Sequence, residues 1–335
     1  MDDARFDVLL FGLIEAEYLL GLDAAPVAGE ARVIEAEVRR AGGSALRCAR
    51  VLALWGARVC LMGNPLADDS NGRLIVRELN EMPDVAHCAS HAASLPAGYE
   101  TPYSVICLAR DEGRTVLTRH GCAQKFDRSS FATGSETSGE SGAQSDSPRD
   151  SACASHACAS HMSTHAWPQA RLAAICGDHL ARASLDLART MNRRDVPLFA
   201  LDAVLDATSE TALRSAPNIF PNGFDEASTG FSQWLGDLPR GEKNTVVVNR
   251  NEAKIWWQPS GGELQNLTLP QTAQNANVDL LAREGSESVF LAGLLWARLR
   301  EWEWRRSLGF AAAAFSLALN APGATPSLGQ IEAVS

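Results

Sequence analysis

The sequence predicts an α/β protein in which a mostly parallel sheet is covered by helices on both faces, giving three layers. Short apolar runs typical of buried strands alternate along the chain with longer segments that have the periodicity of amphipathic helices. The alternation begins near the N-terminus and continues to two helices near the C-terminus. The chain has 335 residues, 46% of them hydrophobic, which is enough for one large domain over residues 1–335.

The first half of the main domain is expected to contain strands and helices in turn. Residues 8–14 and 58–62 are apolar strands, and residues 31–39 alternate polar and apolar side chains, as a half-exposed strand does. Helices are expected at residues 45–55 and around residues 74–79.

A small β-lid is expected beside this domain. Residues 103–108 and 114–118 form two apolar runs on either side of a polar turn, which is the pattern of a hairpin. Together with the early half-exposed strand, this hairpin predicts a lid built from residues 13–40 and 98–121.

Residues 125–166 differ in composition from the rest of the chain. They are rich in Ser, Gly, Ala, Thr and His and contain almost no large apolar side chains, so we expect a disordered low-complexity insertion. Its Cys-Ala-Ser-His repeats have ligand chemistry for zinc or copper, but no hydrophobic shell surrounds them. Repeat expansion is the preferred interpretation, and no metal held directly by protein ligands is expected.

The α/β pattern resumes with an apolar strand at residues 171–176. A helix at residues 181–191 and strands at 196–202, 218–220 and 245–248 continue it. Long helices are expected at residues 288–305 and 307–319. This order of elements favours parallel strands joined by crossover helices.

Charge and cysteine usage exclude several classes of function. Lys and Arg total 30 against 40 Asp and Glu, and a net charge of −10 gives no electrostatic footprint for nucleic acid or an anionic membrane. No apolar run is long enough to span a membrane. The eight cysteines lack the spacing of a disulfide scaffold, which favours a reducing, cytoplasmic compartment.

A candidate anion site begins at Gly285. Residues 285–293 read G-S-E-S-V-F-L-A-G, a loop of small residues that opens into an apolar helix. The first N–H groups of a helix lack intrahelical partners, and the aligned peptide dipoles place positive potential there. Gly285, Ser286 and Glu287 are therefore candidate anion-hole residues.

Four segments, taken in order, resemble the ribokinase/PfkB family of carbohydrate kinases. Gly42-Gly43 with Arg47 resembles the family's G-G-x-x-x-N helix start, and residues 63–73 resemble its G-N-x-x-G-D-D-x-x-G-R element. Residues 220–225, F-P-N-G-F-D, are similar to its f-P-N-x-x-E segment, and residues 285–293 stand where the family has G-A-G-D-A-F-x-A-G. The resemblance covers nearly the whole chain outside the insertion.

The resemblance implies an activity and a set of site residues. Family members transfer the γ-phosphoryl group of Mg-ATP to a hydroxyl of a sugar, and a homodimer formed through the lid is common among them. The implied partners are ATP and a sugar or sugar phosphate. The implied substrate-binding residues are Glu17, Gly42, Gly43 and Arg47, and the implied nucleotide or magnesium residues are Asn222, Asp225, Asn249 and Asn251.

The chain departs from the family at the catalytic position. Ser288 stands where the resemblance places the catalytic Asp, or Gly285 does if the register is counted from Asp279, and neither can act as a base. General base catalysis is worth about 10²–10⁴-fold in rate. The sequence therefore predicts an impaired kinase; the alternative is a non-catalytic pseudokinase that serves as a ligand-binding or scaffold protein.

Two further substitutions leave alternatives open. Glu287 either fills the anion hole of its own helix, or it or Glu284 reaches the position of the missing base. Arg47, where the family has Asn, suits a phosphorylated or acidic ligand, or it pairs with Glu17 across an empty pocket. Asn249 and Asn251 replace a T-x-G, which removes the backbone freedom of that glycine.

Overall fold

The computed structural model describes most of the chain outside the long central insertion. The described residues are 5–82, 84–87, 98–109, 114–121, 167–177, 181–201, 218–220, 244–249, 254–270, 281, 284–320 and 325–335. The predicted insertion at residues 125–166 and its Cys-Ala-Ser-His repeats lie outside them.

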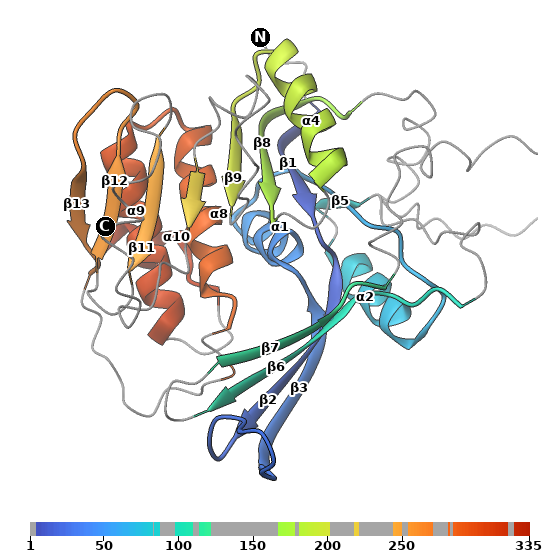
Figure 1. Ribbon diagram of the computed structural model, residues 1–335. Helices are drawn as coiled ribbons and strands as arrows, with labels where there is room; N and C mark the ends of the chain where they lie inside the picture. Colours follow the sequence, from blue (N-terminus) through green and yellow to red (C-terminus); the bar gives the residue numbers. More distant parts are fainter. Residues whose placement is uncertain are drawn as a thin grey trace, which may run out of the picture.

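The main sheet has the predicted, mostly parallel arrangement (Figure 1). Within the described chain nine strands follow one another in the order β13 (Gln265–Thr268), β12 (Lys254–Gln258), β11 (Thr245–Asn249), β10 (Asn218–Phe220), β9 (Leu198–Leu201), β8 (Ala170–Cys176), β1 (Phe6–Gly12), β4 (Val59–Gly63) and β5 (Val85–His87). All neighbours from β11 to β5 pair in parallel. The sequence did not predict β12 and β13, which add an antiparallel edge.

Helices cover both faces of this sheet, as predicted. On one face α1 (Ser44–Leu54), α2 (Ser70–Asn80), α8 (Ser286–Leu299) and α9 (Trp304–Asn320) share one apolar cluster with the strands. On the other face α4 (Ala181–Arg193) packs over a second cluster that contains Leu9, Phe11 and Ile175. The two clusters lie on opposite sides of the sheet, because successive side chains of β1 point to opposite faces.

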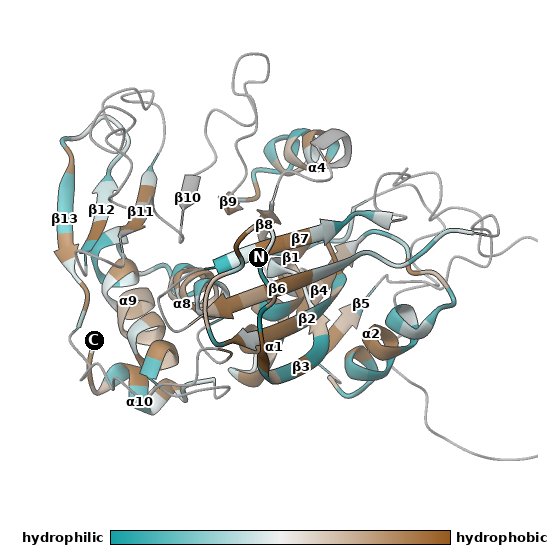
Figure 2. Ribbon diagram, turned by 60° about the horizontal axis from the view of Figure 1, so that its bottom comes forward, coloured by the Kyte–Doolittle hydropathy of each residue, from teal (hydrophilic) through white to brown (hydrophobic). Residues whose placement is uncertain are grey.

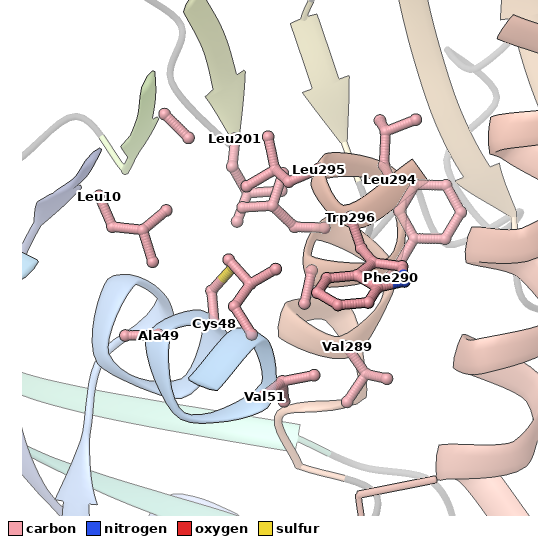
Figure 3. Close-up of a cluster of buried hydrophobic side chains, with 14 of the residues drawn as sticks. Leu10, Cys48, Ala49, Val51, Leu201, Val289, Phe290, Leu294, Leu295 and Trp296 are labelled. Atoms are coloured by element: carbon pink, nitrogen blue, oxygen red, sulfur yellow. The ribbon is translucent and has the colours of Figure 1, made fainter. Parts of the chain in front are cut away.

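The contact between α1 and α8 forms the centre of the first cluster. Figure 3 shows Cys48 and Val51 on the side of α1 that faces Val289 and Trp296 of α8. Nearly every residue of α8 is buried, which fits a helix that is apolar on all sides. Burying a side chain such as that of Phe290 contributes about 1.5–3 kcal/mol. This packing fixes the start of α8 relative to the start of α1.

The predicted boundaries of the last two helices were wrong. The sequence predicted one helix over residues 288–305, whereas α8 ends at Leu299 and α9 begins at Trp304. The N–H of Arg300 donates to Ala297 O and the N–H of Glu301 donates to Arg298 O, and Glu301 has a left-handed φ of 59°. A side chain in that conformation stops a helix, and nothing in the local apolar pattern indicates it. A short helix, α10 (Leu328–Glu332), was also missed.

The predicted β-lid is present as a second sheet. Its strands follow the order β3 (Ile34–Gly42), β2 (Glu15–Leu22), β6 (Tyr103–Ala109) and β7 (Arg114–Arg119). The predicted hairpin is the antiparallel pair β6 and β7, and β2 joins β6 in parallel. Figure 2 shows that β2 and β6 are largely apolar, whereas β3 at the edge is more hydrophilic.

Helix α2 holds the base of the lid against the main domain. The hydroxyl of Tyr18 donates to Asn71 Oδ1 at 2.8 Å, and Arg39 donates to the same oxygen at 2.7 Å. Glu78 accepts from the Ala41 N–H at 3.0 Å. None of the helices that the structure describes has the length and apolar character needed to span a bilayer.

Candidate functional site

The candidate site lies where the base of the lid meets the first turns of α1 and α8. The loop before α1 approaches the lid closely at Gly42 and Gly43. A Cβ atom at Gly42 would overlap the side chain of Glu17, and one at Gly43, whose φ is 89°, would overlap the Leu13 carbonyl. The two glycines therefore allow β2 and the start of α1 to come into contact, because only glycine leaves this space and tolerates this φ.

Glu17 is the most buried charged group of the site, with 1% of its surface exposed. Its carboxylate accepts from the Gly43 N–H at 3.0 Å, from Arg40 Nε at 2.9 Å and from Arg47. Burial by itself would raise the pKa of Glu17, but the charges of Arg47 and Arg40 outweigh burial and hold this pKa well below its usual range. Glu17 is therefore a fully ionised group whose acceptors are already engaged.

Arg47 extends from α1 across the start of α8. One end of its guanidinium pairs with Glu17, and its Nε lies 3.3 Å from Ser288 Oγ. A Cβ atom placed on Gly285 would lie 2.9 Å from Arg47 Cδ and 3.2 Å from Arg47 Nε. The Arg47 side chain, 14% exposed, therefore covers the first turn of α8. The pairing of Arg47 with Glu17, which the sequence left as one of two alternatives, is present.

The first turn of α8 begins after a left-handed glycine. Gly285 precedes the helix with φ 100°, and no side chain caps the turn. Ser286, Glu287 and Ser288 are 3%, 8% and 1% exposed. Among the described residues the Ser286 hydroxyl has no hydrogen-bond partner, although its oxygen is buried. The negative charge of Glu287 in this turn is favourably placed for the helix dipole, which is worth about 0.3–1 kcal/mol.

A second ion pair closes the lid side of the site. Both carboxylate oxygens of Glu284 accept from Arg114 of β7, each at 2.9 Å, and Arg40 donates to the Glu284 carbonyl at 3.1 Å. Burial would raise the pKa of Glu284, but its bond to Arg114 and the charge of Arg47 lower it. A carboxylate held in this way is a weak base.

Glu15 is the third carboxyl of the cluster, and sequence reasoning missed it. It lies on the same face of β2 as Glu17, and its Oε2 accepts from Ser104 at 2.7 Å. Burial, joined by the negative charges of Glu17 and Glu284 and opposed by Ser104 and Arg47, raises its pKa to about 7. Strand alternation relates residue 15 to residue 17, and this signal could have identified it.

The structure brings together most of the predicted site residues. The substrate-side set and the anion-hole set form one cluster: Glu17, Gly42, Gly43, Arg47, Gly285, Ser286, Glu287 and Ser288. Asn249 is the last residue of β11, four strands away from β1 in the main sheet. Asn222, Asp225 and Asn251 lie outside the described residues. Arg40 and Arg114 complete the cluster, but neither was predicted.

The three-layer α/β domain with its four-stranded lid has the ribokinase-like fold, and Arg47 lies across the start of α8. No family model matches the sequence, and neither does any curated protein. Solved structures match over almost the whole chain. A putative ribokinase from Agrobacterium tumefaciens matches with a TM-score of 0.67 and 15% identity, over 98% of this chain and 96% of that chain.

Two other solved structures match equally broadly. A ribokinase from Cryptococcus neoformans var. grubii serotype A in complex with ADP gives a TM-score of 0.66 and 16% identity, over 98% of each chain. An Arabidopsis thaliana ribokinase complexed with ribose and ATP gives a TM-score of 0.63 and 14% identity, again over 98% of each chain. At these identities the matches establish the fold, and the predicted ribokinase-like fold class is confirmed.

Proposed function

We propose that this protein is a divergent member of the ribokinase/PfkB family of carbohydrate kinases that has lost most or all of its phosphotransfer activity. On this proposal the fold serves a ligand-binding or scaffold role. The observation that carries the proposal is the position of Arg47, which reaches from Glu17 to Ser288 and covers Gly285. In a working kinase of this fold, the same space would hold the acceptor hydroxyl and the phosphoryl group.

The loss of a base supports the proposal. Ser288, at the position that the resemblance gives to the catalytic Asp, ends in a hydroxyl that accepts from Arg47. A hydroxyl beside a guanidinium cannot take a proton from a sugar near neutral pH, and base catalysis of this kind is worth about 10²–10⁴-fold. Glu284 is a poor substitute, since Arg114 engages both of its oxygens.

We expect the Arg47 side chain to hinder transfer of a phosphoryl group at the first turn of α8, because it lies against Gly285, the residue that precedes the helix. Mg-ATP would bring the phosphoryl group and the charge-neutralising metal ion if the protein were active. The nucleotide residues proposed from the resemblance, Asn222, Asp225 and Asn251, lie outside the described part of the chain.

A working kinase with a displaced base is the second candidate. Glu287 is buried in the first turn of α8, next to Ser288, and a glutamate is longer than the missing aspartate. Arg40 and Arg47 both border the site, which would suit a phosphorylated or acidic sugar if Arg47 swung away from Glu17. Loss of a measured sugar-dependent activity in Glu287→Gln would favour this candidate.

Ligand binding and turnover together test the proposal. Thermal unfolding of the purified protein should be measured with Mg-ATP, with a panel of sugars and sugar phosphates, and with both together. A ligand at 100 times its dissociation constant adds about 2.7 kcal/mol of stability, a readily measured shift. We expect no phosphoryl transfer from labelled ATP to any sugar of the panel. Transfer at rates of ordinary kinases, about 1–100 s⁻¹, would overturn the proposal.

We also propose a cytoplasmic location and a homodimer formed through the lid. Four cysteines among the described residues are buried thiols outside any disulfide, which suits a reducing compartment: Cys48, Cys60, Cys107 and Cys176. The lid strands expose Ile34, Val38 and Leu117 to 53%, 43% and 61%, which gives an apolar surface for a second copy. Light scattering during size-exclusion chromatography gives the mass; a monomer at all concentrations would exclude the dimer.

A further inference from the structure

The lid touches the main domain at both of its ends. Near the point where the chain enters the lid, Glu17 pairs with Arg47 of α1. Arg114 of β7 lies towards the opposite end of the lid. It pairs with Leu108 of β6, and Leu108 pairs in turn with Gly21 near the end of β2. The side chain of Arg114 reaches Glu284, immediately before α8. The two contacts are anchored four residues apart along β2. Arg40, the cross-strand neighbour of Glu17, also donates to the Glu284 carbonyl, so the lid is held to the start of α8 from two positions.

The far contact combines charge with apolar packing. Arg114 donates from Nε and from a terminal nitrogen to the two oxygens of Glu284, a bidentate geometry that is stronger than a single ionic hydrogen bond. The Glu284 side chain is 4% exposed and that of Arg114 is 46% exposed, so the pair lies at the edge of the lid. Behind it, Leu19, Ile106 and Leu108 of the lid form a cluster with Leu281.

We propose that Arg114 and Glu284 latch the lid shut over the start of α8 when no ligand is bound. A lid that closes on a substrate needs contacts made by that substrate, whereas here the contacts are supplied by the chain itself: the bidentate pair, the Arg40 bond to the Glu284 carbonyl, and the apolar cluster around Leu281. The latch does not depend on the proposed loss of phosphotransfer, since an active enzyme could also be latched.

The latch predicts a specific pattern of hydrogen exchange. The N–H of Ser286 lies in the first turn of α8, where it has no intrahelical acceptor, so its exchange depends on how well this turn is covered. In the ligand-free protein, a peptide spanning residues 284–291 should therefore exchange slowly at its first amides. In Arg114→Gln these amides should exchange roughly tenfold faster, the scale expected when a partly exposed bidentate pair is lost.

Faster exchange in Arg114→Gln could come from an open lid, from the loss of a positive charge on the lid, or from an unpaired Glu284 carboxylate. Two further variants distinguish these causes. Arg119→Gln removes the same charge from the same strand, but Arg119 pairs with Glu100 and both side chains are more than half exposed, at 59% and 51%. It should leave residues 284–291 protected. The double variant Arg114→Gln/Glu284→Gln leaves no stranded carboxylate and should still exchange fast. Unchanged exchange in β8, in the core of the sheet, would show that each variant is folded.

Three outcomes would overturn the latch. They are rapid exchange of residues 284–291 in the wild-type protein, equal exchange in Arg114→Gln and Arg119→Gln, and recovery of wild-type protection in the double variant. The last would mean that an unpaired Glu284, and not an open lid, caused the faster exchange. Phosphoryl transfer measured on the wild-type protein tests the proposed function separately, so either idea can fail while the other stands.

Discussion

Arg47 Nε and Ser288 Oγ lie 3.3 Å apart, although 241 residues separate them in the chain. The contact joins the first turns of α1 and α8. Arg47 occupies the gap with a permanent positive charge, and Ser288 meets it with a neutral oxygen. The donor and the acceptor at the two positions are thus complementary to each other.

Restoring both positions should restore some chemistry. In Ser288→Asp alone, the new carboxylate would lie beside Arg47 and pair with it, so we expect no activity. In Arg47→Asn/Ser288→Asp the pocket is open and a base is present, and we expect sugar-dependent phosphoryl transfer at least 10²-fold, on the order of a general base's contribution, above wild type. Transfer from labelled ATP measures it. Equal activity in the single and double variants would show that Arg47 does not block the site.

Removing Arg47 should destabilise the protein more than removing an exposed arginine does. Arg47→Met leaves the buried Glu17 without its main partner, and breaking a buried pair in this way costs about 3–5 kcal/mol. Arg58→Met, which removes an arginine that is 60% exposed beside Asp7, should cost less than about 1 kcal/mol. Urea unfolding measures both. In Arg47→Met/Glu17→Gln most of the lost free energy of unfolding should be regained. A double variant as unstable as Arg47→Met would show that lost packing, and not the unpaired charge of Glu17, causes the destabilisation.

Glu15 should make stability depend on pH above the usual glutamate range. Its folded pKa is raised from 4.5 to about 7, so between these values the native state binds more protons than the unfolded chain, and stability falls as pH rises. Glu15→Gln removes the ionisation. The variant should match wild type within about 0.5 kcal/mol at pH 4 and exceed it by about 1–3 kcal/mol at pH 8.

Denaturant unfolding at the two pH values measures this difference. Glu263→Gln, at an exposed position, is the control and should show the same difference from wild type at both. A stability difference between Glu15→Gln and wild type that does not change with pH would mean that Glu15 remains ionised in the folded protein.

Alanine at two glycines should have opposite effects. Gly285 has φ 100° and a Cβ there would approach Arg47 Cδ to 2.9 Å, so Gly285→Ala should cost about 1–3 kcal/mol. Gly309 lies inside α9, where an added Cβ would have no neighbouring atom within 4 Å, and Gly309→Ala should stabilise by about 0.5–1 kcal/mol. Thermal unfolding compares them. A harmless Gly285→Ala would show that Arg47 is not held against the start of α8.

Local patterns predicted the elements but not all their limits. The β-α alternation, the lid hairpin and the small-residue loop at Gly285 can each be read from a dozen neighbouring residues, because the periodicity of side chains reflects which face is buried. The edge strands β12 and β13 were missed. The end of α8 was misplaced because the left-handed Glu301 lies inside a continuous run of helix-forming residues.

The sequence by itself determined that no aspartate stands at position 288 or 285, that the fold is three-layered, and that glycines flank both helix starts. Only the tertiary structure decided that Arg47 covers Gly285 and that Arg114 reaches Glu284 across 170 residues. The physical reason is that an ion pair forms where the closed fold brings two charges together, and no local pattern records that distance. Whether a charged residue binds a ligand or its own chain is therefore settled by packing.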